Sequence, residues 1–240
     1  MSVVAAAADT GRIDPYTRIH KALRARLCAT LVAAGRCDGS DPQDTGNLLA
    51  DLRETLAMLQ RHRELENRFL HPALEARRPG STRTAAGDHA RQEREIDELL
   101  AIAFRLEHLP QLRRAALATR LHHDFSRLVA GELEHMALEE REHNRLLWET
   151  HSDDELRALE QAIHADITPQ EKGLSLRWML PNLTAGERAG LVAGLQARQP
   201  AAQFADTLAG LLPLLDAGQR QQLAAALGLE FRPTDYVGMA

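Results

Sequence analysis

The sequence predicts an all-α protein: an up-down-up-down four-helix bundle followed by a C-terminal region of short helices. Ala, Leu, Arg and Glu dominate a chain in which aromatic residues make up only 4%, and this composition favours helices over sheets. Apolar residues recur every three or four positions along four long stretches, and short connections join these stretches. This pattern is typical of antiparallel bundles. We therefore expect a bundle domain at residues 12–150 and a second helical region at 151–230.

Four stretches carry the helical pattern in order: residues 15–35, 47–72, 84–109 and 110–150. The first opens with a proline, which is favoured in the first turn of a helix. The second is expected to end where Pro72 interrupts it, because proline lacks a backbone N–H and disturbs the helix ladder. The fourth is long enough to carry a kink. Short loops between the stretches make consecutive helices antiparallel neighbours.

The region after residue 151 is predicted to fold into shorter helices with well-defined starts. Residues 180–188 match residues 212–220, which predicts a duplicated helical hairpin. The leucines and low charge of this hairpin suit the contact of a homodimer, and packing within its own chain is the alternative. Four segments have the capping-box pattern of Ser, Thr or Asp followed three positions later by Glu or Gln. They are Ser152 with Glu155, Thr168 with Glu171, Thr184 with Glu187, and Asp216 with Gln219.

Charge and composition exclude several functional classes. The net charge is −5 at pH 7 and no stripe of Lys and Arg stands out, so a nucleic-acid partner is not expected. No apolar run approaches the ~18 residues of a membrane-spanning helix. The apolar run at residues 3–8 lacks a preceding basic region and is too short for a signal peptide. Cys28 and Cys37 form no CxxC motif, so free thiols in a reducing cytoplasm are expected.

Histidine and glutamate side chains occur on the apolar faces of the four predicted helices. Three helices repeat His-x-x-x-Glu, a spacing that advances about 6 Å along the axis and keeps both groups on one face. Counted along alternating helices, the histidines gather toward one end of the bundle. A buried His or Glu is costly unless something pairs with it. The residues are His20 on the first helix, His62 and Glu66 on the second, His89 and Glu93 on the third, and His135 and Glu139 on the fourth.

A metal ion is the simplest partner for these groups. One helix could give an imidazole nitrogen to one metal and a carboxylate that bridges toward a second metal ~3.5–4 Å away. Imidazole with carboxylate suits iron, manganese or zinc, and the absence of thiolates argues against a structural zinc finger. A single histidine on an apolar stripe is more often a core residue with an ordinary hydrogen bond. Four histidines at one level on four helices favour ligation instead.

The same segments resemble the hemerythrin-like, or HHE cation-binding, family, and the resemblance covers residues 12–150. In this family a four-helix bundle holds a non-haem di-iron centre. An oxygen bridge and carboxylates link the two irons. Members bind oxygen, sense oxygen, nitric oxide or iron, or respond to oxidative and nitrosative stress. The segments that carry the resemblance are Ile19-His20, His62-Arg-Glu-Leu-Glu66 with His71-Pro72, Asp88-His89, and His135-Met-Ala-Leu-Glu139-Glu140.

The resemblance implies two iron ions as the cofactor and a role for each candidate ligand. Histidines from the four helices would bind the irons, and one carboxylate from each His-x-x-x-Glu segment of the second and fourth helices would bridge them. Zinc or manganese is the alternative metal. The implied histidines are His20, His62, His89 and His135, and the implied bridges are Glu66 and Glu139.

The sequence departs from oxygen-carrying members of the family at one position and leaves a second position open. Those members place a second histidine four residues after the first on the third helix, where this chain has Glu93. Glu93 lowers the imidazole count and adds an anionic ligand, which favours ferric iron and makes reversible oxygen carriage less secure. Oxygen carriers also take the last carboxylate five residues after the final histidine, at Glu140. Glu139 fits the apolar stripe better, and both residues remain candidates for the last ligand.

Three functions fit these observations. The first is a cytoplasmic metal-binding protein whose di-iron centre binds or senses O2, NO or iron. The second is a di-iron enzyme that acts on peroxide or nitric oxide, and the third is a structural bundle without functional metal. Two further histidines have ordinary interpretations. His143 is a surface residue or a hydrogen-bond partner of Glu139, and His71 marks the end of the second helix.

Overall fold

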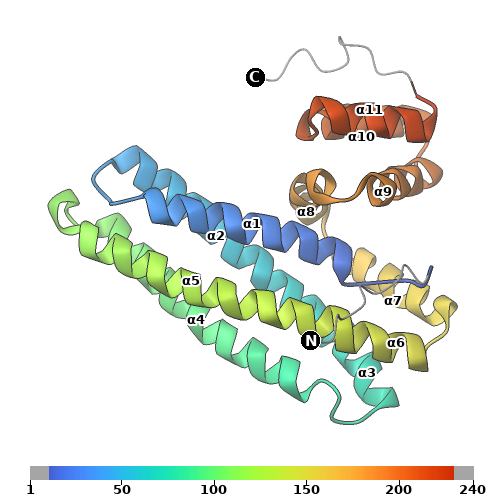
Figure 1. Cartoon of the computed structure of the whole chain (residues 1–240), viewed down its shortest axis with the longest axis horizontal. Coiled ribbons are helices and arrows are strands. Elements are labelled where there is room, and N and C mark those ends of the chain that lie inside the picture. Colours follow the sequence, from blue (N-terminus) through green and yellow to red (C-terminus); the bar gives the residue numbers. More distant parts are fainter. Residues whose placement is uncertain (1–10, 230–240) are drawn as a thin grey trace, which may run out of the picture. The chain divides into compact units, whose positions relative to one another are not determined.

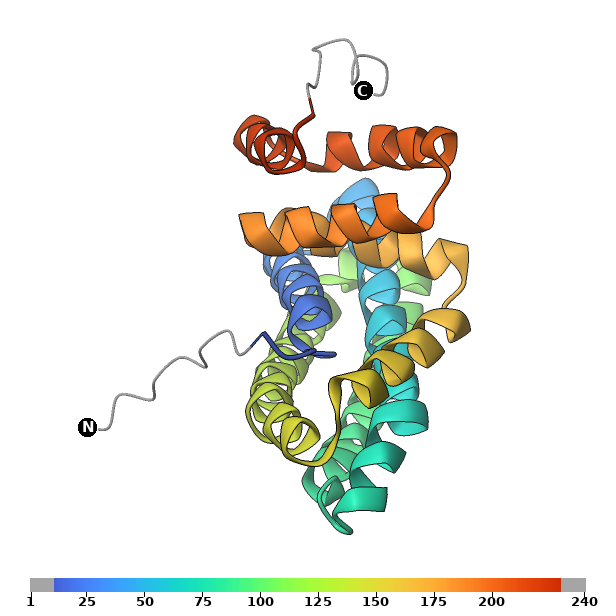
Figure 2. The ribbon, with the colours of Figure 1, turned by 90° about the vertical axis from the view of Figure 1, so that its right-hand side faces the viewer.

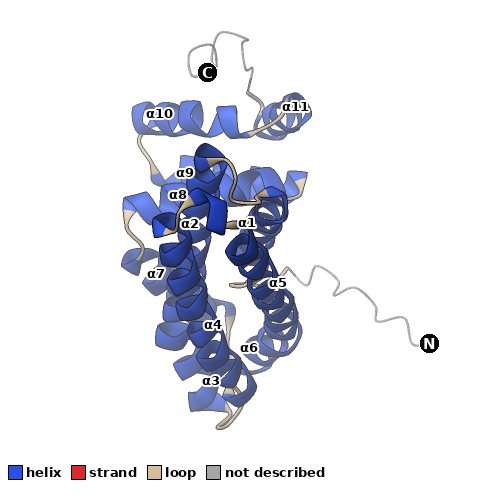
Figure 3. Ribbon diagram, turned by 90° about the vertical axis from the view of Figure 1, so that its left-hand side faces the viewer, coloured by secondary structure: helices blue, strands red, loops and turns tan. Residues whose placement is uncertain are grey.

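The computed structural model describes residues 11–229, and all regular secondary structure in this range is helical, with no strand (Figure 3). The prediction of an all-α protein is therefore confirmed. No helix in the described range is long and apolar enough to cross a membrane. The apolar run at residues 3–8 and the last residue of the second predicted region, residue 230, lie outside the described residues.

Four long helices run alongside one another in the first part of the chain (Figure 1). The Thr30 hydroxyl on the first helix lies 2.8 Å from the Thr55 hydroxyl on the second, which joins these two helices in the interior. The third helix contacts both the second and the fourth. Leucine, isoleucine and phenylalanine side chains with less than 2% exposure fill the space between them. The four helices are α1 (Thr17–Arg36), α2 (Pro42–Leu65), α4 (Arg83–His108) and α5 (Ala115–Leu138).

The second helix begins earlier than the sequence pattern predicts. Helix α2 starts at Pro42, five residues before the predicted start at Asn47. The Asp41 side chain accepts hydrogen bonds from the backbone N–H groups of Gln43 and Asp44, at 2.6 and 3.1 Å. A capping aspartate followed by proline is a strong start signal, and here it precedes the first residue of the apolar stripe.

The prediction that Pro72 ends the second helix is wrong. A single π-helical turn, η1 (Glu66–Leu70), follows α2 and leads directly into α3 (His71–Arg77). In η1 the N–H of His71 bonds to the carbonyl of Glu66, five residues earlier. Pro72 then lies in the first turn of α3. The π turn has already shifted the hydrogen-bond ladder at this point, so the missing N–H of proline does not break the helix.

The fourth helix has the same construction as the second. A short 3-10 turn, η2 (Gln111–Arg113), precedes α5, so the helix starts later than Pro110. A second π turn, η3 (Glu139–His143), joins α5 to α6 (Asn144–Thr150). Isolated π turns within helices are rare and are frequent at functional sites. Both π turns begin with a glutamate that the sequence analysis predicts as a metal ligand.

Helix α7 (Asp153–Asp166) packs against the π turn η1 that follows α2. Arg61 on α2 donates a hydrogen bond of 2.9 Å to the Asp166 carboxylate at the end of α7. The compact unit accordingly comprises residues 11–20 and 26–167, and it continues past the predicted boundary after residue 150. Leu156 of α7 lies in an apolar cluster that closes the unit at the end where α3 and α6 lie. The cluster comprises Tyr16, Leu70, Leu74, Leu146, Leu147 and Leu156.

The second compact unit comprises residues 168–229 together with residues 21–25. Its helices form two layers, α8 with α9 and α10 with α11 (Figure 2). All four predicted capping boxes are present, with both reciprocal hydrogen bonds in each. The homodimer contact expected for this region stays a prediction. The helices are α8 (Pro169–Asn182), α9 (Ala185–Arg198), α10 (Ala201–Leu211), the 3-10 turn η4 (Leu212–Leu214) and α11 (Ala217–Leu227).

The sequence repeat corresponds to a repeated structural connection. Arg188 donates to the carbonyl of Leu180 at 3.1 Å, and Arg220 donates to the carbonyl of Leu212 at 3.5 Å. In each copy, the arginine near the start of a helix bonds back to the end of the preceding one. The two copies therefore share this connection, and the duplication of a whole hairpin stays a prediction. The core of the second unit comprises Leu180, Val192, Phe204, Leu211, Leu215 and Leu223.

Candidate metal centre

Six of the seven predicted ligands come together in the interior of the first unit. They form two groups of four side chains, and within each group the candidate ligand atoms lie within 4.8 Å of one another. Both groups include the same two glutamates. The first group comprises His20, His62, Glu66 and Glu139, and the second comprises Glu66, His89, His135 and Glu139.

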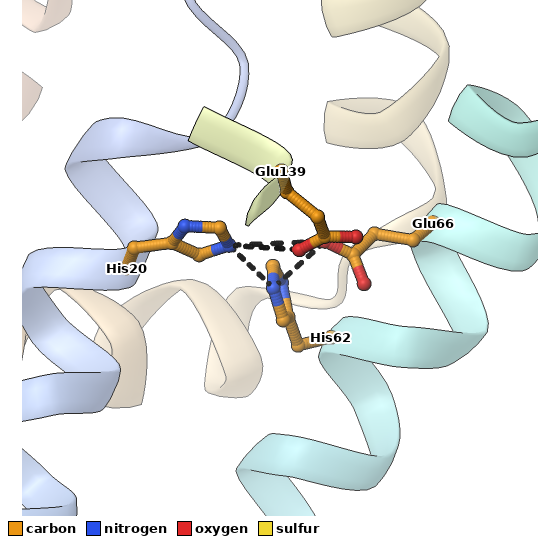
Figure 4. A group of neighbouring side chains, drawn as sticks. All are labelled: His20, His62, Glu66 and Glu139. Carbon is orange, nitrogen blue, oxygen red and sulfur yellow. Dashed lines mark hydrogen bonds and ion pairs between the residues drawn. The ribbon is translucent and has the colours of Figure 1, made fainter. Parts of the chain in front are cut away.

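The first group joins α1, α2, η1 and η3 (Figure 4). The Nε2 atom of His20 lies 3.1 Å from Nε2 of His62 and 3.5 Å from Oε2 of Glu139. The Nε2 atom of His62 lies 2.9 Å from Oε1 of Glu66. Figure 4 shows the two rings and the two carboxylates pointing toward one common point. Two nitrogens and two carboxylates converging in this way could hold a metal ion.

The second group joins the same carboxylates to α4 and α5. The Nε2 atoms of His89 and His135 lie 2.9 Å apart. His89 Nε2 is 3.4 Å from Oε2 of Glu66, and His135 Nε2 is 3.4 Å from Oε2 of Glu139. Glu66 therefore presents one oxygen to each group. This is the arrangement in which a carboxylate bridges two cations.

The two carboxylates are buried without ordinary hydrogen bonds. Glu66 and Glu139 are 1% and 0% exposed. None of their four oxygens accepts a well-aligned hydrogen bond within residues 11–229. A buried carboxylate without such partners is unfavourable by several kcal/mol in the absence of a compensating charge. The donor set therefore fits one or two metal cations, whose charge would compensate both groups.

Burial sets the protonation of the centre in the metal-free protein. It raises the pKa of Glu139 well above its ordinary value, and the Glu66 charge nearby acts in the same direction. Burial alone would also raise the pKa of Glu66, but the attraction of His62, His20 and His89 together outweighs it and lowers that pKa. Burial lowers the pKa of His62, and it lowers the pKa of His135 to about 3. The neutral rings of His62 and His135 have lone pairs available for a metal. Glu139 is protonated more readily than an ordinary glutamate, so a metal that binds to it would displace this proton.

Two polar side chains hold two of the rings by hydrogen bonds on the side away from the centre. The Nδ1 atom of His20 lies 3.1 Å from a carboxylate oxygen of Glu140, and Nδ1 of His89 lies 2.9 Å from Oδ1 of Asn67. Glu140 follows Glu139, just as Asn67 follows Glu66. A carboxylate can only accept a hydrogen bond, so the His20 proton lies on Nδ1 and Nε2 is left as the ligand atom. The Asp88 carboxylate lies 3.5 Å from Nδ1 of His135, close enough for electrostatic attraction but without a hydrogen bond.

The structure places the two candidates for the last carboxylate ligand, Glu139 and Glu140, at different positions. Glu139 belongs to both groups, whereas Glu140 lies behind the His20 ring. The helix repeat explains the difference, because a four-residue step from His135 stays on the inner face and a five-residue step turns away from it. Glu140 is therefore placed to orient the His20 ring and belongs to neither group.

Glu93 is the predicted ligand that the structure does not bring to the centre, so its assignment to the inner face is wrong. Its side chain is exposed, whereas the neighbouring Gln92 is fully buried. The buried face of α4 continues from His89 through Gln92 and Ile96, and a four-residue step from His89 leads to the solvent edge of that face. Glu93 lines a surface pocket that also reaches His89 and Asn67.

Sequence reasoning missed Tyr16 and His71 near Glu139, and it left His143 open between a surface residue and a partner of Glu139. His143 is buried, so the surface interpretation is wrong, and His71 is a buried residue of a continuous helix rather than a helix end. Both lie close to Glu139, and Tyr16 lies against His143. The four-residue step from Glu139 to His143 was a usable signal. His71 is five residues beyond Glu66, and only the π turn brings it to the same side.

Comparison of the chain with protein-family models, with curated proteins and with solved structures finds no match. The class of protein is therefore defined by the structure itself. It is an all-α protein with buried clusters of histidine and glutamate that could hold a metal ion.

The buried His71 makes the stability of the metal-free protein depend on pH. Burial lowers the pKa of His71 to about 4, from about 6.5 in the unfolded chain. Between these values the unfolded state binds a proton that the folded state does not, so stability falls as pH falls through this window. Relative to His71→Gln, the wild type should lose on the order of 2–3 kcal/mol between pH 7 and pH 4. Urea denaturation of both proteins measures this, and parallel pH profiles would contradict it.

Proposed function

We propose that the chain is a hemerythrin-like protein with a non-haem di-iron centre that binds or senses a small ligand such as O2 or NO. In this proposal α1, α2, α4 and α5 form an up-down-up-down four-helix bundle around the two irons. Iron is chosen over zinc or manganese because the ligand segments resemble those of the hemerythrin-like family. Sensing of iron itself is a third form of the same function.

One observation carries the proposal: two buried groups share both of their carboxylates. Each group supplies two imidazole nitrogens and the carboxylates of Glu66 and Glu139. One iron would bind in each group, with the glutamates between them. A single metal would leave one pair of buried histidines without a cation. The symmetric placement of Asn67 and Glu140 behind His89 and His20 also supports two equivalent positions.

The ligand set leaves coordination positions open. Four protein groups do not complete the octahedral shell that iron prefers with nitrogen and oxygen ligands. When bound, the irons would supply the affinity for O2 or NO at these open positions. Hydrogen bonds to Glu140 and Asn67 hold the His20 and His89 rings in one tautomer, and the carboxylates of Glu66 and Glu139 are buried. The fixed tautomer keeps Nε2 of each ring free for the metal, and burial limits the access of water to the centre.

A specific observation also supports a second candidate function, a di-iron enzyme acting on peroxide or nitric oxide. The Tyr16 hydroxyl carries a proton beside His143, and His143 and His71 are ring bases at 3.8 and 3.9 Å from Glu139. A binder of O2 needs no such groups, whereas reduction of peroxide or nitric oxide consumes protons. The Tyr16 hydroxyl lies 3.3 Å from Nδ1 of His143, within reach for a proton to pass between them.

Metal analysis of protein produced with ample iron tests the proposal. We expect two irons per chain and the near-ultraviolet absorption of an oxo-bridged ferric pair, which reduction bleaches and O2 restores. Peroxide turnover well above that of free iron would favour the enzyme. A protein that carries only sub-stoichiometric zinc and shows no such absorption would support the structural-bundle hypothesis instead.

A further inference from the structure

Glu139 presents its other oxygen to buried side chains that the two groups do not use. His71 Nε2 lies 3.9 Å and His143 Nδ1 lies 3.8 Å from Oε1 of Glu139, whereas Oε2 faces His20 and His135. His71 and His143 are 6% and 2% exposed. One ligand atom from each of His71, Glu139 and His143 lies within 4.8 Å of the others.

The three ligand atoms of this cluster all carry lone pairs, and too few hydrogen-bond donors lie nearby to satisfy them. A neutral histidine ring has one nitrogen with a lone pair, and Nδ1 of His143 lies 3.3 Å from the Tyr16 hydroxyl. This hydroxyl can donate to Nδ1. His71 Nε2 and Glu139 Oε1 are buried and have no hydrogen-bond partner within residues 11–229. Such an arrangement is unfavourable unless a cation or a donor lies between the atoms.

We propose that His71 Nε2, His143 Nδ1 and Glu139 Oε1 form a third cation position, which takes a divalent transition metal. Two imidazoles with one carboxylate are a donor set typical of iron(II) and zinc sites with open positions. Both histidine nitrogens lie at 3.8–3.9 Å from Glu139 Oε1, which suits three ligands spread around one ion at wide angles, because metal–ligand bonds are about 2.1 Å long. This inference rests on the proposed function only in that the third position shares Glu139 with the paired centre.

Charge predicts that the third ion binds last and most weakly. Three divalent cations around Glu66 and Glu139 leave an excess of positive charge in a buried site. The carboxylates of Glu140 and Asp88 lie behind His20 and His135 and offset part of it. The remaining repulsion between cations is strong because the interior screens it poorly. The first two ions should therefore fill the paired groups before the third position is occupied.

Titration of the metal-free, full-length protein with Co2+ tests the proposal. Cobalt substitutes for iron or zinc without oxygen chemistry, and its visible absorption reports nitrogen coordination. We expect two tight equivalents and a third weaker one. His71→Gln and His143→Gln should each remove only the weak equivalent and its part of the spectrum. His123→Gln is the matched control, because His123 is exposed and belongs to no group. Far-ultraviolet circular dichroism checks that each variant folds.

The possible outcomes separate this inference from the proposed function. Two equivalents that both survive in His71→Gln and His143→Gln would overturn the third position and leave the paired centre standing. A single equivalent that is lost in His71→Gln but kept in His62→Gln would support the third position and overturn the paired centre. Absence of any specific cobalt binding would overturn both.

Discussion

Replacing Glu66 by glutamine is expected to empty both metal positions at once. Glu66 is the residue whose two oxygens divide between the groups, with Oε1 at 2.9 Å from His62 and Oε2 at 3.4 Å from His89. An amide keeps the shape of the side chain but removes the negative charge that two cations would share. Iron content should fall from about two per chain to near zero, because bridged cations repel each other without the carboxylate between them.

Two other glutamates provide matched comparisons for this experiment. Glu64→Gln changes an exposed carboxylate on the same helix and should leave the iron content unchanged. Glu140→Gln weakens the hydrogen bond behind His20 but removes no ligand. It should lower metal affinity by roughly 10–100-fold while the stoichiometry at saturation is kept. Full iron content in Glu66→Gln, measured by elemental analysis, would argue that the two groups do not share a carboxylate-bridged pair.

The sequence predicted those parts of the site that depend on regular helix geometry. A four-residue step stays on one face, so His62 with Glu66 and His135 with Glu139 were correctly placed together. The same rule failed at Glu93. His89 lies near the edge of the buried face of α4, and there a three-residue step, to Gln92, leads inward instead. Periodicity predicts that a face exists, but not where on that face a given residue lies.

The remaining parts of the site depend on interactions that a linear pattern does not contain. Each π turn inserts one residue into the helix ladder and changes which later side chains face inward. The insertion brings His71 beside Glu139, although Pro72 predicted that the helix would end there. Asp41 similarly starts α2 ahead of its apolar stripe. The packing of neighbouring helices decides between alternative patterns of backbone hydrogen bonds, and the sequence alone does not show this packing.

Replacing His135 by alanine should remove the stabilisation that metal provides, together with the metal. Binding to the folded state alone stabilises a protein by RT ln(1 + [L]/Kd), which is about 4 kcal/mol when the free metal exceeds Kd 1,000-fold. His135 is 2% exposed and belongs to the group completed by α4 and α5. Its loss leaves His89 as the only imidazole of that group. Iron content and the metal-dependent part of the unfolding free energy should therefore fall in parallel.

The informative quantity is the difference in unfolding free energy between metal-loaded and metal-free protein. Truncating a buried side chain also leaves a cavity. The cavity destabilises the metal-loaded and the metal-free protein alike, so its effect cancels in the difference. His123→Ala, on the exposed side of the same helix, should retain the full difference. An unchanged difference in His135→Ala would mean that metal, if bound, is held elsewhere. In the wild type, each unpartnered oxygen of Glu66 and Glu139 favours unfolding until a cation compensates it, so metal binding and folding stability should depend on the same residues.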